Sequence, residues 1–110
     1  DYFHKKKIVK PAPYLIEGLG DEFLIKCVDF SLLDDMYQVS DKMAFQHAGE
    51  LVKKEGIITK NSSGAALWGV LKLAKSLPKP ARIATIFPDN TSRYLSTIFN
   101  QEWLKKKNLL

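Results

Sequence analysis

Several features that mark common classes of protein are missing from this chain. It has one cysteine, Cys27, so it can form no internal disulfide, and no cysteine–histidine cluster indicates a metal site. No apolar run approaches the roughly 20 residues of a membrane-spanning helix, and the polar N-terminal residues show no secretory signal. Because Cys27 lies in a largely apolar run, we expect a buried, inert thiol in a cytoplasmic protein.

The sequence also lacks a catalytic set that could act alone. It has no Gly-rich phosphate loop, no metal-binding pair and no nucleophile elbow. Its two histidines are His4, in a basic lead-in, and His47, away from the apolar side of an amphipathic segment, so we expect both at the surface. We therefore predict neither a catalytic residue nor a metal ligand in this chain.

The composition is that of an ordinary globular domain. The 110 residues are 45% hydrophobic and 26% charged, which predicts one domain with a modest core. The net charge of +5 comes largely from lysine runs at 5–7 and 105–107. A basic nucleic-acid-binding module is one alternative, but no recognised motif accompanies the lysines, and we predict solvated ends. The first residue is Asp rather than Met, so we expect a fragment or a processed chain.

Periodicity divides the chain into an irregular or partly helical lead-in at 1–13 and a region of alternating elements at 14–110. The predicted strands are residues 14–16, 57–59 and 82–87. The predicted helices are residues 31–37, 41–54, 64–76 and 91–99, with one more turn at 102–104. This alternation predicts an α/β fold, a parallel sheet with flanking helices.

Two of the helices carry clear signals. The helix at 41–54 has Ser40 as its N-cap and Gly56 after its end, with Phe45, Ala48 and Leu51 on one face beside Val52. The helix at 64–76 is apolar round most of its circumference, so we expect it to be buried.

Ligands of parallel α/β proteins bind beyond the C-terminal ends of strands, which here are residues 18–20, 60–64 and 88–90. The turn Ser62-Ser63-Gly64 is the most informative, since it opens a helix directly after a predicted strand. Its backbone amides could hold a phosphate, or a hydroxyl could face a ring nitrogen. Plain capping of the helix is the third reading, and the residues alone leave all three open.

Taken in order, these segments resemble the cystathionine β-synthase and cysteine synthase family. The similar segments are YLIEGLG at 14–20, VDFSLLDD at 28–35, VSD at 39–41 with AF at 44–45, EGII at 55–58, SSGAA at 62–66, FPD at 87–89, RYL at 93–95 and EWL at 102–104. The resemblance covers about residues 14–110, and the ending EWLKK is closer to cystathionine β-synthases.

The resemblance implies the C-terminal portion of the large domain of a fold-type-II pyridoxal-phosphate enzyme, similar to the tryptophan synthase β-subunit. It implies that the Ser62 hydroxyl bonds the pyridine nitrogen of pyridoxal 5'-phosphate and that the Gly18 backbone lies beside the cofactor. Residues 88–89 would support the serine turn. The implied reaction is β-replacement on serine or an activated serine with a thiol, in cysteine or cystathionine biosynthesis.

In that family the Schiff-base lysine and the phosphate loop belong to an earlier part of the polypeptide. We therefore expect the isolated chain to be inactive and to bind the cofactor weakly. The expected partners are that N-terminal part, serine-like and thiol substrates, and further copies in a homo-oligomer, with no nucleic acid and no membrane. Lys60 and Asn61 stand where the family usually has small residues. They motivate an alternative, a non-catalytic binding or scaffold domain that kept the fold and lost the cofactor.

Overall fold

The computed structural model describes residues 2–7, 13–16, 19, 23–88 and 100–109. The chain divides into two compact units, residues 1–38 and residues 39–110, and each is described by itself. Gly18, Asp89 and the predicted helix at 91–99 lie outside the described residues.

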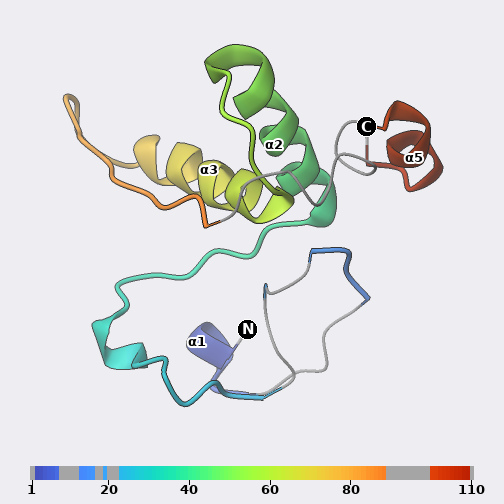
Figure 1. Cartoon of the computed structure of the whole chain (residues 1–110). Coiled ribbons are helices and arrows are strands. Elements are labelled where there is room, and N and C mark those ends of the chain that lie inside the picture. The colour runs from blue at the N-terminus through green and yellow to red at the C-terminus, as the bar shows by residue number, and fades with distance from the viewer. Residues whose placement is uncertain (1, 8–12, 17–18, 20–22, 89–99, 110) are drawn as a thin grey trace. The chain divides into compact units, whose positions relative to one another are not determined.

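Among the residues of the first unit that the structure describes, two short helical elements are present (Figure 1). Helix α1 spans Tyr2–Lys5, and a single 3₁₀ turn, η1, spans Phe30–Leu32 where a helix at 31–37 was predicted. The carboxylate of Asp29 caps this turn, accepting hydrogen bonds from the Ser31 amide at 3.0 Å and the Ser31 hydroxyl at 2.7 Å. The Leu33 backbone after the turn is extended, so the turn does not continue into the predicted helix.

Two further predictions fall in this unit. His4 is exposed as expected, with its Nε2 3.2 Å from Asp35 Oδ1. The prediction of a buried Cys27 is wrong, because the thiol is exposed. Residues 26–27 form a turn, closed by the Val28 amide donating to the Ile25 carbonyl, and this turn presents the side chain to solvent.

In the second unit, helix α2 spans Asp41–Glu55 and begins and ends close to where it was predicted. The Ser40 hydroxyl accepts a hydrogen bond from the Met43 amide, and Gly56 ends the helix with a φ of 67°. Of the predicted apolar face, Phe45, Ala48 and Leu51 are buried and Val52 is half-buried, and Ala44 is buried beside them.

Helix α3 spans Asn61–Ala74 and so begins three residues earlier than predicted. The polar turn is therefore the first turn of the helix, and Lys60 is an N-cap without a side-chain cap bond. Burial is confined to this end of the helix, at Asn61, Ser63, Gly64 and Ala65. The expectation of a helix buried along its length is wrong, since its later residues are half-buried or, like Leu71, exposed.

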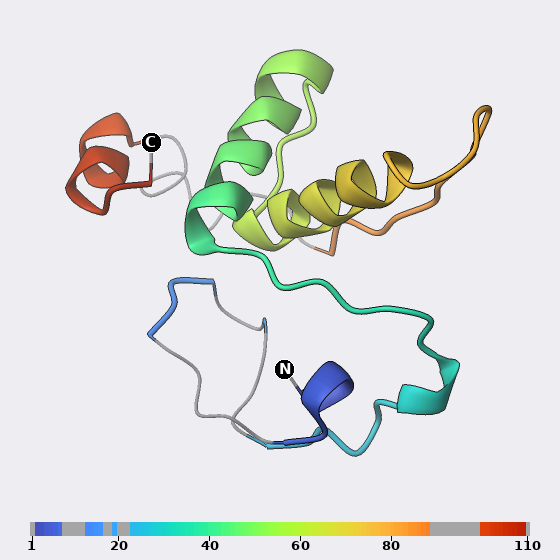
Figure 2. The same ribbon diagram turned by 180° about the vertical axis from the view of Figure 1, so that it is seen from behind.

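Helices α2 and α3 cross at a point of close backbone approach, visible from both sides (Figures 1 and 2). Ala44 and Ala48 of α2 are fully buried against Gly64 of α3. A Cβ atom added at Gly64 would overlap the Ala44 carbonyl oxygen and lie 2.9 Å from the Ala48 Cβ. Residue 64 must therefore be glycine for the helices to meet in this way.

The predicted parallel sheet is absent from the part of the chain that the structure describes. Residues 56–60 connect α2 to α3, and residues 81–88 follow α3, without a strand in either segment. A strand exists only through hydrogen bonds to a neighbouring strand, and neither segment has such a neighbour among these residues. Their apolar side chains are consequently open to solvent: Ile57 is 41%, Ile58 58% and Ile86 80% exposed.

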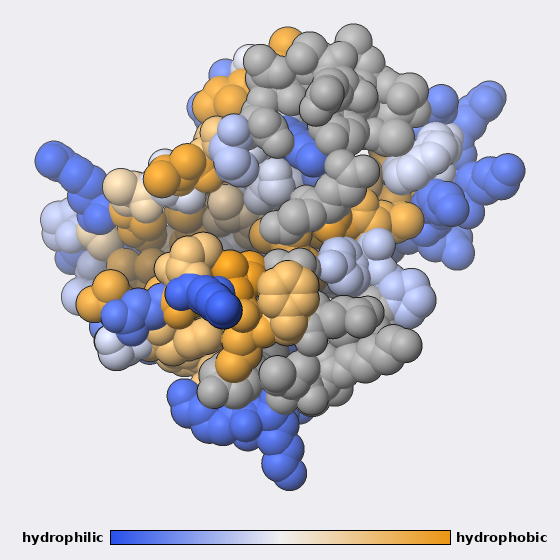
Figure 3. All heavy atoms as spheres, turned by 60° about the horizontal axis from the view of Figure 1, so that its bottom comes forward, coloured by the Kyte–Doolittle hydropathy of each residue, from blue (hydrophilic) through white to orange (hydrophobic). Residues whose placement is uncertain are grey.

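Exposed apolar side chains are numerous on this chain, and hydrophobic residues reach the surface beside hydrophilic ones (Figure 3). Within the described helices, none is long and apolar enough to cross a bilayer.

The predicted turn near the C-terminus is confirmed as helix α5, Gln101–Lys106. Asn100 caps it by accepting a hydrogen bond from the Trp103 amide at 3.0 Å. The Trp103 ring lies 5.7 Å from the Phe45 ring of α2, measured between centroids, and Leu104 and Leu109 are buried. This apolar contact attaches α5 to α2.

Candidate functional site

A cluster of buried polar residues marks the start of α3. The exposed fractions are 1% for Thr59, 7% for Lys60, 6% for Asn61 and 0% for Ser63. Burying a polar group costs free energy unless it is hydrogen-bonded. The described residues meet this requirement, because none of their buried side-chain nitrogen or oxygen atoms lacks a partner.

One bond in this cluster joins the segment before α3 to the helix itself. The Thr59 hydroxyl donates to the Ser63 hydroxyl at 2.5 Å, and both side chains are buried. The Ser63 side chain therefore points into the protein, and its hydroxyl joins the segment before α3 to the helix.

The backbone amides at the start of α3 are also engaged. The Ser62 amide donates to the Asn61 carboxamide oxygen at 2.9 Å. The amides of Ser63 and Gly64 both donate to the Lys60 carbonyl, at 3.1 and 3.3 Å. Amides already bonded within the chain are poorly suited to holding a phosphate. Of the readings left open by the sequence, a phosphate cradle is thus the least compatible with the geometry.

Ser62 differs from its neighbours. Its side chain is half-buried at the second position of α3, and its hydroxyl has no hydrogen-bond partner within the part of the chain that the structure describes. The two serines of the turn therefore differ: the Ser63 hydroxyl is bonded inside the protein, whereas the Ser62 hydroxyl could bond a ligand. Gly18, the other predicted cofactor-binding residue, lies outside the described residues.

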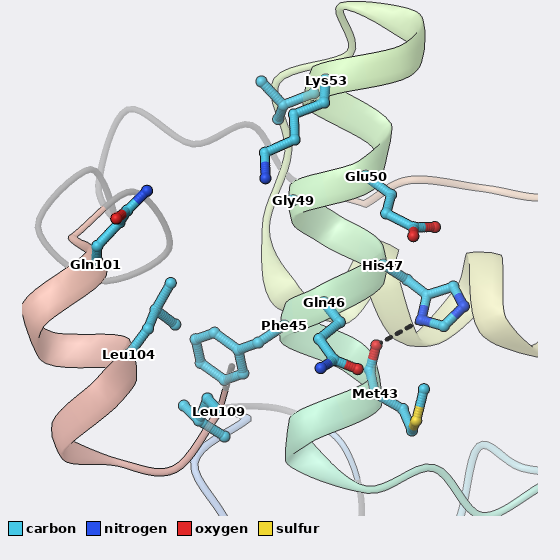
Figure 4. Close-up of a pocket in the computed structure, with 11 residues that line it drawn as sticks. Met43, Phe45, Gln46, His47, Gly49, Glu50, Lys53, Gln101, Leu104 and Leu109 are labelled. Atoms are coloured by element: carbon cyan, nitrogen blue, oxygen red, sulfur yellow. Dashed lines mark hydrogen bonds between the residues drawn. The ribbon is translucent and has the colours of Figure 1, made fainter.

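A second feature is a cleft of about 540 Å³ between α2 and α5. Figure 4 shows Phe45, Leu104 and Leu109 pointing toward one another in it, and its lining also includes His47 and Glu50 on another side of α2. The His47 ring is half-buried rather than fully at the surface, with Nδ1 2.7 Å from the Met43 carbonyl oxygen.

Among the described residues, no three histidine, cysteine, aspartate or glutamate side chains come together in a group that could hold an ion.

Sequence reasoning missed two members of the polar cluster, Thr59 and Asn61. Thr59 was assigned to a buried strand on its β-branched character, and Asn61 to a turn. One signal was available: a hydroxyl four residues before a second hydroxyl, across a helix start, allows the side-chain bond that the structure contains.

Comparison with known proteins places this geometry in context. Residues 2–89 match the family of pyridoxal-phosphate dependent enzymes. The chain is 37% identical over 99 residues to the cystathionine beta-synthase of Saccharomyces cerevisiae, a match covering 87% of this chain and 20% of that protein. It is 40% identical over 87 residues to the O-acetylserine dependent cystathionine beta-synthase of Bacillus subtilis, covering 79% and 28%.

A cysteine synthase of Buchnera aphidicola is 38% identical over 108 residues, which is 96% of this chain and 34% of that protein. The chain thus spans about a fifth to a third of the length of these relatives. With the family match covering most of its residues, the chain belongs to the pyridoxal-phosphate dependent enzymes.

Proposed function

We propose that this chain is the C-terminal portion of a cystathionine β-synthase or cysteine synthase that joins serine or an activated serine to a thiol. Relatives with these names match most of the chain, and one of them is named for its dependence on O-acetylserine. The whole enzyme would use pyridoxal 5'-phosphate, and the chain alone, covering so little of its relatives, would not turn over substrate.

The available hydroxyl of Ser62 carries this proposal. It stands at the start of a helix that is locked in place on both sides, by the Thr59–Ser63 bond and by the α2 crossing at Gly64. A fixed, half-buried hydroxyl can accept or donate one hydrogen bond to a flat aromatic ring without changing the fold. These residues therefore fit the ring-nitrogen end of the cofactor, and the Gly18 backbone would lie beside it.

Bound pyridoxal 5'-phosphate supplies an electron sink for β-elimination and β-replacement. The contribution of Ser62 would be to bond the ring nitrogen through a neutral group, which leaves that nitrogen largely unprotonated. The positive end of the α3 dipole acts in the same direction, because it disfavours a cation at the start of the helix. Both effects moderate the electron sink and suit elimination at the β-carbon.

The rest of the polypeptide would complete the fold. We infer that residues 57–59 and 82–87 become strands of a parallel sheet when the remaining part supplies neighbouring strands. The exposed Ile57, Ile58 and Ile86 support this inference, since pairing would cover them. Without that cover, self-association of the chain is expected. A reducing, cytoplasmic setting suits its single, exposed thiol.

The scaffold alternative rests on Lys60 and Asn61, whose side chains could crowd a ring. Both are more than nine-tenths buried in the chain's own fold, and the Asn61 oxygen is engaged by the Ser62 amide. This placement favours the enzyme over the scaffold. The scaffold hypothesis predicts that changing both residues to glycine in the full-length polypeptide restores cofactor binding, whereas the enzyme hypothesis predicts no gain.

The proposal is tested in the full-length polypeptide that contains this chain. The wild type should show a cofactor absorbance band in the near ultraviolet or visible. Ser62→Ala should weaken cofactor binding about fivefold, the effect of losing one neutral hydrogen bond. Ser76→Ala, which removes an exposed hydroxyl at the other end of α3, serves as the matched control. A folded wild type without the band refutes the function, and unchanged binding in Ser62→Ala refutes the role of Ser62.

A further inference from the structure

Asn61 occupies an unusual position for a side-chain amide. It is the first residue of α3, where side chains commonly extend into solvent, yet it is only 6% exposed. Its oxygen accepts the Ser62 amide at 2.9 Å, so the side chain folds back over the start of its own helix. Lys60, the N-cap residue, makes no side-chain cap bond, which leaves this task to Asn61.

The neighbouring hydrogen bond holds the other side of Ser62. The Thr59 hydroxyl donates to Ser63, which directly follows Ser62, and neither hydroxyl is accessible to water. The Ser62 amide is thus fixed by the preceding residue, and the residue after Ser62 is fixed by Thr59. The direction of the Ser62 side chain follows from its backbone, so these two bonds restrict where the hydroxyl can point.

We propose that Asn61 is a positioning residue that orients the Ser62 hydroxyl toward the ring nitrogen of the cofactor. The inference rests on the proposed function for its ligand, but the orientation itself is a property of the chain. Asn61 touches no reacting atom and acts only through Ser62. In this role, a residue that seemed to obstruct the cofactor site instead holds its ring-binding hydroxyl in place.

Amide hydrogen exchange at Ser62, measured by NMR on the 110-residue chain without cofactor, tests the orientation directly. Asn61→Ala removes the acceptor while keeping a good helix former, so exchange at Ser62 should accelerate about fivefold. Asn61→Leu keeps the volume without the acceptor and should behave in the same way. Asn61→Asp keeps an oxygen acceptor at a helix N-terminus, where a carboxylate is favoured, and should retain slow exchange.

Gln101→Ala is the matched control, since Gln101 is an exposed side-chain amide at the first position of α5. It should leave exchange at Ser62 unchanged. If Asn61→Ala and Asn61→Leu exchange as slowly as the wild type at Ser62, the positioning role is overturned, whatever the cofactor does.

The link to the cofactor is measured in the full-length polypeptide by absorbance titration with pyridoxal 5'-phosphate. Asn61→Ala should raise the dissociation constant severalfold, and Asn61→Asp should stay close to the wild type. Unchanged affinity in Asn61→Ala, with Ser62→Ala still impaired, overturns the inference and leaves the proposed function standing. Unchanged affinity in Ser62→Ala refutes the role of Ser62 and with it the link to the cofactor, and the exchange result shows separately whether Asn61 orients Ser62.

Discussion

Replacing Gly64 with alanine is the most direct test of the helix crossing that supports the site. The added Cβ would overlap the Ala44 carbonyl oxygen and the Ala48 backbone nitrogen, and would lie 2.9 Å from the Ala48 Cβ. Two of these three atoms belong to the backbone of α2, so no side chain can rotate away. The helices would have to separate, opening the contact at Ala44 and Ala48, both now 0% exposed.

The expected free-energy change combines two opposed effects. Forcing a methyl group into a filled contact costs about 3 kcal/mol, toward the upper end of what overpacking usually costs. Alanine gains about 1 kcal/mol over glycine inside a helix. Gly64→Ala should therefore lower the free energy of unfolding by about 2 kcal/mol, the net of these two effects.

Urea unfolding of the 110-residue chain, followed by circular dichroism at helical wavelengths, measures this change. Gly49→Ala is the matched control: Gly49 also lies inside a helix, but an added Cβ there meets nothing within 4 Å. The control should raise the free energy of unfolding by about 1 kcal/mol. If the two variants prove equally stable, the close crossing of α2 and α3 is wrong.

Two further changes test local features in each unit. Ser40→Ala should lower the free energy of unfolding by about 1 kcal/mol through loss of the α2 N-cap, and an unchanged urea midpoint would contradict that cap. The hydrogen bonds from the Ser31 hydroxyl and amide hold the pKa of Asp29 below its ordinary value of 3.8. The stabilisation that the ionised Asp29 carboxylate gives to the turn is therefore complete above pH 3.8. It is lost as the pH falls through the lowered pKa. An NMR titration of Asp29 should give the lowered pKa, and Ser31→Ala should raise it. A pKa that stays low in Ser31→Ala would exclude the Ser31 hydroxyl as the main cause of the lowering.

The sequence predicted those elements that local chemistry determines. Helix α2 was found from Ser40, Gly56 and a run of apolar residues at helical spacing, because capping and amphipathicity act within a few residues. The first turn of α3 was misplaced, since Asn61 and Ser62 are typical of turns, whereas in the structure the Ser63 and Gly64 amides both donate to the Lys60 carbonyl.

Predictions that depend on distant residues could not be made reliably. A sheet requires neighbouring strands, and the burial of α3 requires a second surface that covers the helix. The spacing of apolar residues within one segment indicates neither of these. Cys27 was expected inside because its run is apolar, but a turn at residues 26–27 places it outside. Ser62 was chosen from the family resemblance, whereas the difference between its hydroxyl and that of Ser63 emerged only from the Thr59 contact.

The glycine contact between α2 and α3 also constrains how this protein can vary. Ser62 precedes Gly64 by two residues, so any change that shifts α2 at Ala44 or Ala48 displaces the hydroxyl along with it. Substitutions on α2 can therefore alter the proposed cofactor site at Ser62. Mutagenesis libraries intended to retune the chemistry should leave these three small residues fixed and vary the outer face of α2 instead.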